Sequence, residues 1–171
     1  GLGHLNPVHS FTQVPNMDNI KEMHVGNCHT IILKNDGTLW GTGLKNRAGL
    51  GPSAWNDYAT LFTQLTDSNG NILTNVDKII GAAFATIVIK TTGEILAVGP
   101  SNFGDYGTST SYDYFTQIGT MSSLNVKEII PSHRSYFILK NDGTVWVSGA
   151  NYGNKFGVGD SISNYYKFTQ I

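Results

Sequence analysis

The chain has 171 residues, of which 40% are apolar and 13% are charged, and its net charge is −1. This length suits one domain or part of a larger one. The balanced charge argues against a protein that works mainly by electrostatic binding of nucleic acid or acidic membranes. A single cysteine, Cys28, excludes an internal disulfide, and no apolar run reaches the roughly 18 residues that cross a bilayer.

A Phe-Thr-Gln motif recurs along the chain and sets the frame of an internal repeat. Its copies occupy residues 11–14, 62–65, 115–118 and 168–171. Two further markers keep the same order: an Asn-Ile-Lys-Glu-Met type segment at 19–23, 75–79 and 125–129, and a Leu-Lys-Asn-Asp-Gly type segment at 33–40, 89–96 and 139–146. We therefore expect one repeat domain over 1–171, with a partial repeat at 1–14 and repeats at 15–65, 66–118 and 119–171.

Each repeat is predicted to form four short strands, of which the Phe-Thr-Gln segment is counted as the first. The other three are expected at 20–25, 30–34 and 38–41, at 76–80, 86–90 and 94–98, and at 126–130, 136–140 and 144–147. The Asp-Gly pairs at 36–37 and 142–143 predict hairpins, because glycine accepts a positive φ without a Cβ clash. The third strand is apolar almost throughout, which indicates cover on both faces. No segment has a sustained 3.6-residue period, so we expect no long helix.

Four-stranded units of this length are typical of β-propeller blades. The sequence thus predicts an all-β fold of about three blades, each with four antiparallel strands. Three blades cannot close a ring, and three interpretations stay open. The chain, which begins at Gly1, is a fragment of a longer propeller, or copies of it complete a ring, or it is an open arc.

Turn and strand residues also resemble a known family, the regulator of chromosome condensation type of propeller repeat. The first repeat carries Gly26, His29-Thr30, Asp36-Gly37, Trp40, Gly43, Leu50 and Gly51. The second keeps Thr86, Gly93, Gly99, Gly104 and Gly107, and the third keeps Asp142-Gly143, Trp146, Gly149, Asn151, Phe156 and Gly157. No copy has the glutamine that the family places before the leucine of its turn. The resemblance implies a regulatory propeller that exchanges guanine nucleotide on a small GTPase and contacts chromatin.

Catalytic and metal chemistry finds no support in the residue pattern. No pair of the five histidines has zinc-motif spacing, and His29 is expected to form a hydrogen bond inside its own blade. Cys28 is expected to pack as a small apolar residue. Gly41-Thr42-Gly43 lacks the third glycine and the following helix of a phosphate loop. We predict no enzyme activity, no catalytic residue, no metal and no cofactor.

The loops that precede the Phe-Thr-Gln strands differ between repeats and are rich in aromatics among small polar residues. The candidate binding residues in them are Trp55, Tyr58, Tyr112, Tyr114, Tyr165 and Tyr166. Repeat equivalence places the three loops on one side of the arc. Such side chains offer rigid apolar area and adaptable hydrogen bonds for recognition. Alternatively, these aromatics cover the edges of the blades.

The main hypothesis is a non-enzymatic binding or structural module that recognises a protein or a glycan through these loops. Its composition suggests a microbial surface or phage tail fibre protein, hence an extracellular or virion location, with the cytoplasm as an alternative. We expect self-association or a longer propeller, and neither nucleic-acid binding nor membrane insertion. The alternative function is the exchange factor or chromatin-associated scaffold that the family resemblance implies.

Overall fold

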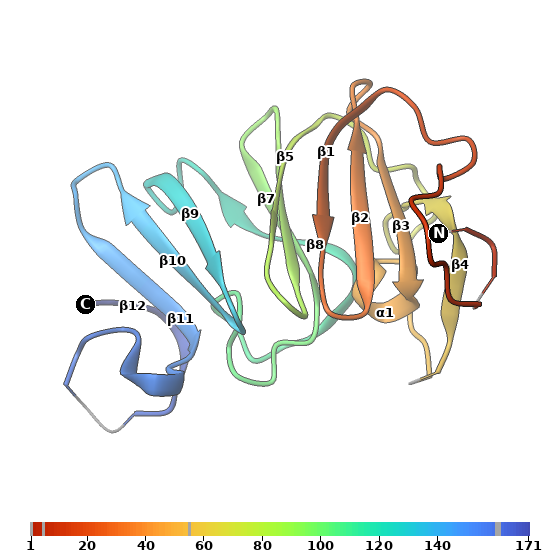
Figure 1. The fold of residues 1–171 in the computed structure, drawn as a ribbon. Helices are drawn as coiled ribbons and strands as arrows, with labels where there is room; N and C mark the ends of the chain where they lie inside the picture. The colour runs from red at the N-terminus through yellow and green to blue at the C-terminus, as the bar shows by residue number, and fades with distance from the viewer. Residues whose placement is uncertain (1, 5, 55, 160–161) are drawn as a thin grey trace.

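A computed structural model describes residues 2–4, 6–54, 56–159 and 162–171. These residues form three four-stranded antiparallel sheets, each hydrogen-bonded in chain order, which stand side by side as blades of an arc (Figure 1). Blade 1 contains β1 (Ile20–Val25), β2 (His29–Lys34), β3 (Leu39–Leu44) and β4 (Tyr58–Gln64). Blade 2 contains β5 (Val76–Gly81), β6 (Thr86–Lys90), β7 (Glu94–Gly99) and β8 (Tyr112–Thr120). Blade 3 contains β9 (Val126–Ser132), β10 (Ser135–Lys140), β11 (Val145–Ala150) and β12 (Asn164–Gln170). The expected all-β fold of partial-propeller type is confirmed.

The Phe-Thr-Gln segments are the last strand of each blade, and the predicted strand order is wrong on this point. Strands β4, β8 and β12 pair with the preceding β3, β7 and β11 of their own sheet. The first copy, at residues 11–14, forms no strand, and the side chain of Phe11 is fully exposed. A Phe-Thr-Gln segment needs an open strand edge to pair with, and among the described residues this copy pairs with no β3-type strand.

Asp-Gly turns close the β2–β3 and β10–β11 hairpins as expected. In the second of these turns, the backbone N–H and the hydroxyl of Thr144 donate to Asp142 Oδ1 at 2.9 and 2.6 Å. Gly143 adopts a φ of +83°, a conformation that side chains with a Cβ rarely adopt. The insertion at 66–71 is also a tight turn, in which Asp67 accepts backbone bonds from Asn69 and Asn71. These local bonds hold the strand register.

Two apolar cores lie between the blades. The first joins blades 1 and 2 through Ile31, Leu33, Val88, Leu96 and other buried residues. The second joins blades 2 and 3, where Ile87 and Tyr106 pack with Tyr136 and Ile138. Ile87 and Val88 are adjacent in β6 and therefore face opposite sides of the sheet. Since each lies in a different core, both faces of blade 2 are buried.

Hydrogen bonds cross between the blades as well. His29 Nε2 lies 3.1 Å from Thr86 Oγ1 of blade 2, so the expected bond inside blade 1 is wrong. The hydroxyl of Tyr136 in blade 3 donates to the Ala85 carbonyl of blade 2 at 2.8 Å. Both contacts reach the start of β6, which sits between the two outer blades.

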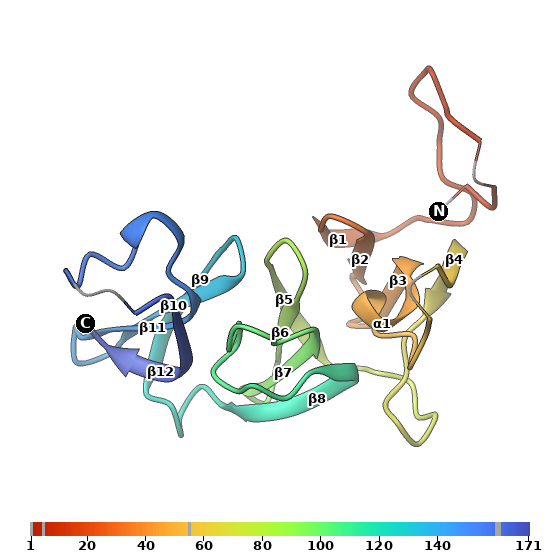
Figure 2. The ribbon, with the colours of Figure 1, turned by 90° about the horizontal axis from the view of Figure 1, so that it is seen from below.

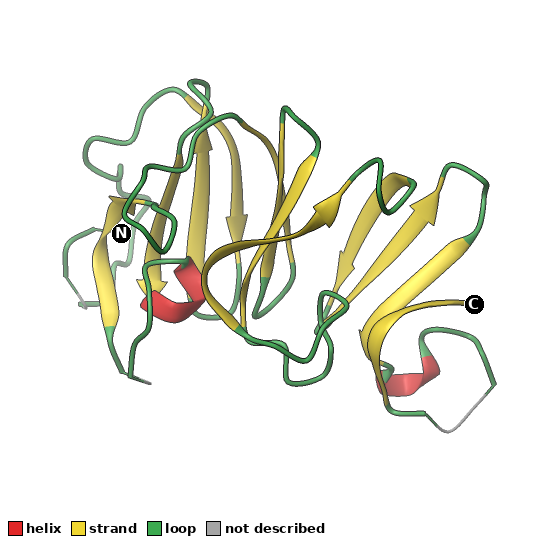
Figure 3. Ribbon diagram, turned by 180° about the vertical axis from the view of Figure 1, so that it is seen from behind, coloured by secondary structure: helices red, strands yellow, loops and turns green. Residues whose placement is uncertain are grey.

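Helical structure in the described residues is limited to α1 (Lys45–Ala48) and the 3-10 turn η1 (Tyr152–Asn154), both at the same end of the arc (Figure 3). Helix α1 follows Gly43, where the sequence predicted no helix, and packs against β7 and β8 of the next blade. Among the described residues, no helix has both the length and the apolar character that crossing a membrane requires.

Candidate functional site

The two ends of the arc differ in what the connections carry. One end holds the short β2–β3, β6–β7 and β10–β11 hairpins, and we call it the hairpin end. The other end, called the loop end, holds the turns at 26–28, 82–85 and 133–134 and the long connections at 45–57, 100–111 and 151–163. The three variable aromatic loops therefore share one end of the arc, as the repeat predicted. Figure 2 views the molecule from this end.

Three repeat positions at the loop end change chemical character from blade to blade. One lies just before β2, β6 or β10, and two lie in the turn that follows β3, β7 or β11. The position before the strand holds Cys28 in blade 1, Phe84 in blade 2 and Arg134 in blade 3. In the same order of blades, the first turn position holds Arg47, Phe103 and Gly153, and the second holds Gly49, Asp105 and Lys155. The neighbouring turn position stays apolar, as Leu50, Tyr106 and Phe156. Since the scaffold needs no charge at these places, the changes point to a role beyond folding.

Arg134 and four aromatic rings form one connected group. The guanidinium carbon of Arg134 lies 4.0 Å from the ring centre of Phe84 and 4.7 Å from that of Phe103. The rings also neighbour one another. The distance between ring centres is 6.0 Å for Phe103 and Tyr152, 6.4 Å for Tyr152 and His133, and 5.6 Å for His133 and Phe84. These five residues, the Arg134 cluster, close a circuit of contacts that joins blades 2 and 3. Its centre is half-buried, whereas His133 and Tyr152 are exposed at its rim.

Arg134 also has an unusual backbone. Its φ of +53° is in the left-handed region, which costs energy for a residue with a Cβ. The two stacking contacts compensate for part of this cost. Among the described residues, its guanidinium makes no hydrogen bond or ion pair, so its N–H groups remain available.

Two more cations lie beside the Arg134 cluster. The ammonium of Lys155 donates to the His133 carbonyl at 2.7 Å and to Ser132 Oγ at 3.5 Å. Arg47 of α1 is buried, and its guanidinium carbon lies 4.9 Å from the ring centre of Phe84. Burial lowers the pKa of both side chains.

Asp105 is a buried carboxylate on which the charges of all three cations act. Its side chain is 1% exposed, and neither oxygen makes a hydrogen bond of standard geometry with a described residue. Burial raises the pKa of Asp105 to about 6, although the positive charges of Arg134, Lys155 and Arg47 oppose the rise. Three cations therefore act on this one carboxylate of raised pKa.

The predicted aromatic candidates have mixed environments. Tyr58 and Tyr166 are 41% and 49% exposed. Tyr112 stacks on Tyr106, with ring centres 5.7 Å apart, and Tyr165 packs edge-on against Phe156 at 5.4 Å.

The last two candidates complete this set. Tyr114 is half-buried, and its hydroxyl fills the space where a side chain at Gly51 of blade 1 would lie. Trp55 lies outside the described residues. All six remain candidates, and of the described five only Tyr58 and Tyr166 are exposed rather than half-buried.

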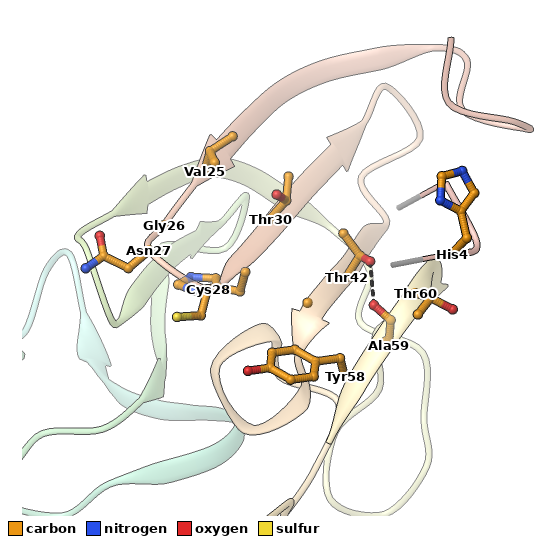
Figure 4. Close-up of a pocket in the computed structure, with 12 residues that line it drawn as sticks. His4, Val25, Gly26, Asn27, Cys28, Thr30, Thr42, Tyr58, Ala59 and Thr60 are labelled. Atoms are coloured by element: carbon orange, nitrogen blue, oxygen red, sulfur yellow. Dashed lines mark hydrogen bonds between the residues drawn. The ribbon is translucent and has the colours of Figure 1, made fainter. Parts of the chain in front are cut away.

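A pocket of about 310 Å³ lies on the outward face of blade 1 (Figure 4). Thr30, Thr42 and Tyr58 are among its lining residues, and the Thr42 hydroxyl donates to the Ala59 carbonyl at 2.8 Å. The residues equivalent to Thr30 are Thr86 and Tyr136, which are fully buried against the preceding blade. The pocket is thus the uncovered form of an inter-blade face, so its shape does not indicate a ligand.

Known structures share the arrangement of these blades. Human WBSCR16 superimposes with a TM-score of 0.69 at 13% identity, over 89% of this chain and 39% of that protein. Prp20p from Saccharomyces cerevisiae, described with its binding to Gsp1p and histones, gives a TM-score of 0.73 at 13% identity over 91% of this chain and 39% of its own. Yeast RCC1 (Prp20) bound to Kap60 gives a TM-score of 0.69 at 16% identity, over 92% of this chain and 39% of its own.

The fold is that of an RCC1-type β-propeller. The chain spans about two fifths of the length of each of these three proteins. No protein-family model matches the sequence. The comparisons therefore show the fold and leave the function to be argued from the residues of the chain.

Sequence reasoning missed the Arg134 cluster, Lys155 and Asp105. The signal was present in the turn glycines, which are eight residues apart in every repeat, at 43 and 51, 99 and 107, and 149 and 157. Aligning the turns on these glycines shows that a neutral position in blade 1 is acidic in blade 2 and basic in blade 3. What no alignment shows is that Phe84 and Arg134, from different blades, stack on each other.

Proposed function

We propose that the chain is the protein-binding part of a non-enzymatic regulatory propeller, with the loop end as its docking face. The observation that carries the proposal is the Arg134 cluster, a stacked guanidinium with available donors and a rim of exposed aromatic residues. Arginine and aromatic side chains dominate the energetic centres of protein interfaces. Tyr166, near the start of β12, adds exposed aromatic area in blade 3.

The similar structures support a protein partner. Prp20p is described by its binding to Gsp1p and histones, and yeast RCC1 is described in a complex with Kap60. Neither description involves a glycan or a cell or virion surface, so the adhesive interpretation has no support from them. A regulatory protein-binding role, first the alternative, is the better supported of the two.

The experiment compares two double variants that differ in which surface they change. His133→Ser with Tyr152→Ser alters the exposed rim of the Arg134 cluster, whereas Lys167→Ser with Gln170→Ser alters exposed residues of β12. Wild type and both variants are immobilised, and the proteins retained from a cell extract are quantified by mass spectrometry. We expect at least one protein that wild type and the β12 variant retain and the rim variant loses. Equal retention on all three would contradict a loop-end docking face.

Nucleotide exchange is the second candidate function. It is favoured by the likeness to Prp20p, which binds Gsp1p, and by the family resemblance of the repeats. The test measures release of a fluorescent guanine nucleotide from Gsp1p and from a panel of small GTPases. Faster release with wild type, lost in the rim variant, would support exchange. Release at the intrinsic rate from every GTPase would leave protein binding without exchange.

A further inference from the structure

We propose that the Arg134 cluster and Lys155 bind the carboxylate of an acidic segment in a partner protein. This inference rests on the proposed function and names the chemistry that the partner presents. The ligand is an Asp or Glu side chain, held by the edge of the Arg134 guanidinium and by the Lys155 ammonium.

The stacking of Arg134 prepares it for a carboxylate. Phe84 and Phe103 contact the flat guanidinium, and the contacts with these rings fix its orientation. A guanidinium donates hydrogen bonds in its own plane, and no described residue accepts one from Arg134, so its donors remain for a ligand. Two parallel N–H donors match the two oxygens of a carboxylate. An already oriented arginine also loses less side-chain entropy on binding.

Lys155 supplies a second charge in a fixed position. Its ammonium donates to the His133 carbonyl and Ser132 Oγ, and an ammonium has three donors. One donor thus remains for a ligand beside the rim of the Arg134 cluster. The whole chain has a net charge of −1, so three cations around one carboxylate are a local excess.

The same arrangement favours a carboxylate over a phosphate group. Asp105 lies within the electrostatic reach of Arg134, Lys155 and Arg47, and when ionised it cancels one of their charges. A dianionic phosphate would meet stronger repulsion from Asp105 than a monoanionic carboxylate does. The exposed rings of His133 and Tyr152 at the rim offer apolar contact for the rest of a peptide chain.

The test measures the binding of a fluorescein-labelled hexaglutamate peptide by fluorescence anisotropy at pH 7.5 and low salt. A hexaglutamine peptide is the uncharged control. We expect hexaglutamate to bind and Arg134→Gln to weaken it about tenfold or more, because a charge-assisted bond contributes roughly 1.5–3 kcal/mol. Lys127→Gln, which removes an exposed cation from β9 of the same blade, is the matched control and should bind like wild type.

A second variant guards against loss of folding at Arg134. Lys155→Gln leaves Arg134 itself unchanged, and it should weaken hexaglutamate binding roughly threefold. Its near-UV circular dichroism spectrum, which reports tertiary packing, should match that of wild type. The proposal is overturned if Arg134→Gln and Lys127→Gln weaken binding equally, or if hexaglutamine binds as well as hexaglutamate. It is also overturned if inorganic phosphate displaces the peptide at lower concentration than acetate does.

Failure of this inference is distinguishable from failure of the proposed function. If the rim variant loses its protein partner while hexaglutamate does not bind, the docking face stands and the carboxylate is wrong. If all variants retain the same proteins, the docking face itself is wrong.

Discussion

The hydroxyl of Tyr136 donates to the carbonyl of Ala85, at 2.8 Å, and so joins the third blade to the second. Tyr136 is fully buried, and burial raises the pKa of its hydroxyl, so the group stays protonated as the donor. The bond lies between the second apolar core and the loop end. It therefore links the packing of the blades to the position of the Arg134 cluster.

Replacing this tyrosine tests the inter-blade bond. Tyr136→Phe should lower the free energy of unfolding by about 0.5–1.5 kcal/mol, because it removes one buried hydrogen bond between the blades while the Ala85 carbonyl keeps the backbone N–H of Ala82 as a donor. Tyr166→Phe, at a half-exposed tyrosine, should change it by less than about 0.5 kcal/mol. The measurement is urea denaturation at pH 7.5. Equal stability of the two variants would show that the bond does not hold the blades together.

His29 makes the junction of blades 1 and 2 sensitive to acid. Burial, helped by the charges of His24 and Arg47, lowers the pKa of His29 from 6.5 to about 3. Since the folded state resists protonation, the stability from neutral His29 is complete above pH 6.5 and is lost as the pH falls toward 3. Wild type should lose about 2 kcal/mol from this residue between pH 7.5 and pH 5.

The control for this effect is His29→Gln, which keeps a polar side chain but does not titrate. Burial lowers the pKa of His24 too, so some acid sensitivity should remain in the variant. Denaturation curves at pH 7.5 and pH 5 give the comparison. A variant that loses as much stability as wild type would place the acid-sensitive group elsewhere.

Asp105 should have the opposite pH dependence. Its pKa of about 6 is above the ordinary 3.8, so the folded state binds its proton more tightly than the unfolded state does. Its contribution to stability therefore falls as the pH rises from 3.8 through 6. Asp105→Asn should stabilise the protein by about 3 kcal/mol at pH 7.5, and this gain should vanish near pH 4. A gain of equal size at both pH values would contradict an ionised Asp105 at neutral pH.

Gly104 sets how closely blade 2 approaches β12. A Cβ at this glycine would overlap the backbone of Tyr165 and Tyr166, and its φ is +81°. Gly143 has a similar φ of +83° but open space around it. Gly143→Ala should cost about 1 kcal/mol from the backbone alone, and Gly104→Ala roughly 1–3 kcal/mol more. Thermal unfolding of both variants checks the difference, and equal losses would argue against close packing at this contact.

The repeat predicted most of the fold because blade residues serve the same purpose in every copy. Apolar β-strand positions such as Ile31 and Ile87 recur because each faces an inter-blade core. The position of the Phe-Thr-Gln strand at the end of a sheet was not predictable from the repeat, since a periodic pattern has no marked start. The consequence is visible at Phe11, which pairs with no strand among the residues that the structure describes.

The candidate site was harder to predict than the fold. The aromatic loops attracted attention by composition, yet Tyr112 and Tyr165 pack largely on their own blades. The Arg134 cluster combines residues from blades 2 and 3 that are isolated in the sequence. Neither Phe84 nor Arg134 belongs to a motif, and only the stacking of adjacent blades brings them within 4.0 Å.

Site-specific photo-crosslinking tests most directly whether the loop end is the docking face. A photoreactive phenylalanine analogue is placed at Tyr152, at the exposed rim of the Arg134 cluster, or at Gln170, at the hairpin end of β12. Both proteins are irradiated in cell extract, with excess unlabelled wild type as competitor. The proposed docking face predicts a discrete protein adduct at Tyr152 that the competitor removes, and none at Gln170. Adducts at Gln170 alone, or equally at both positions, would contradict it.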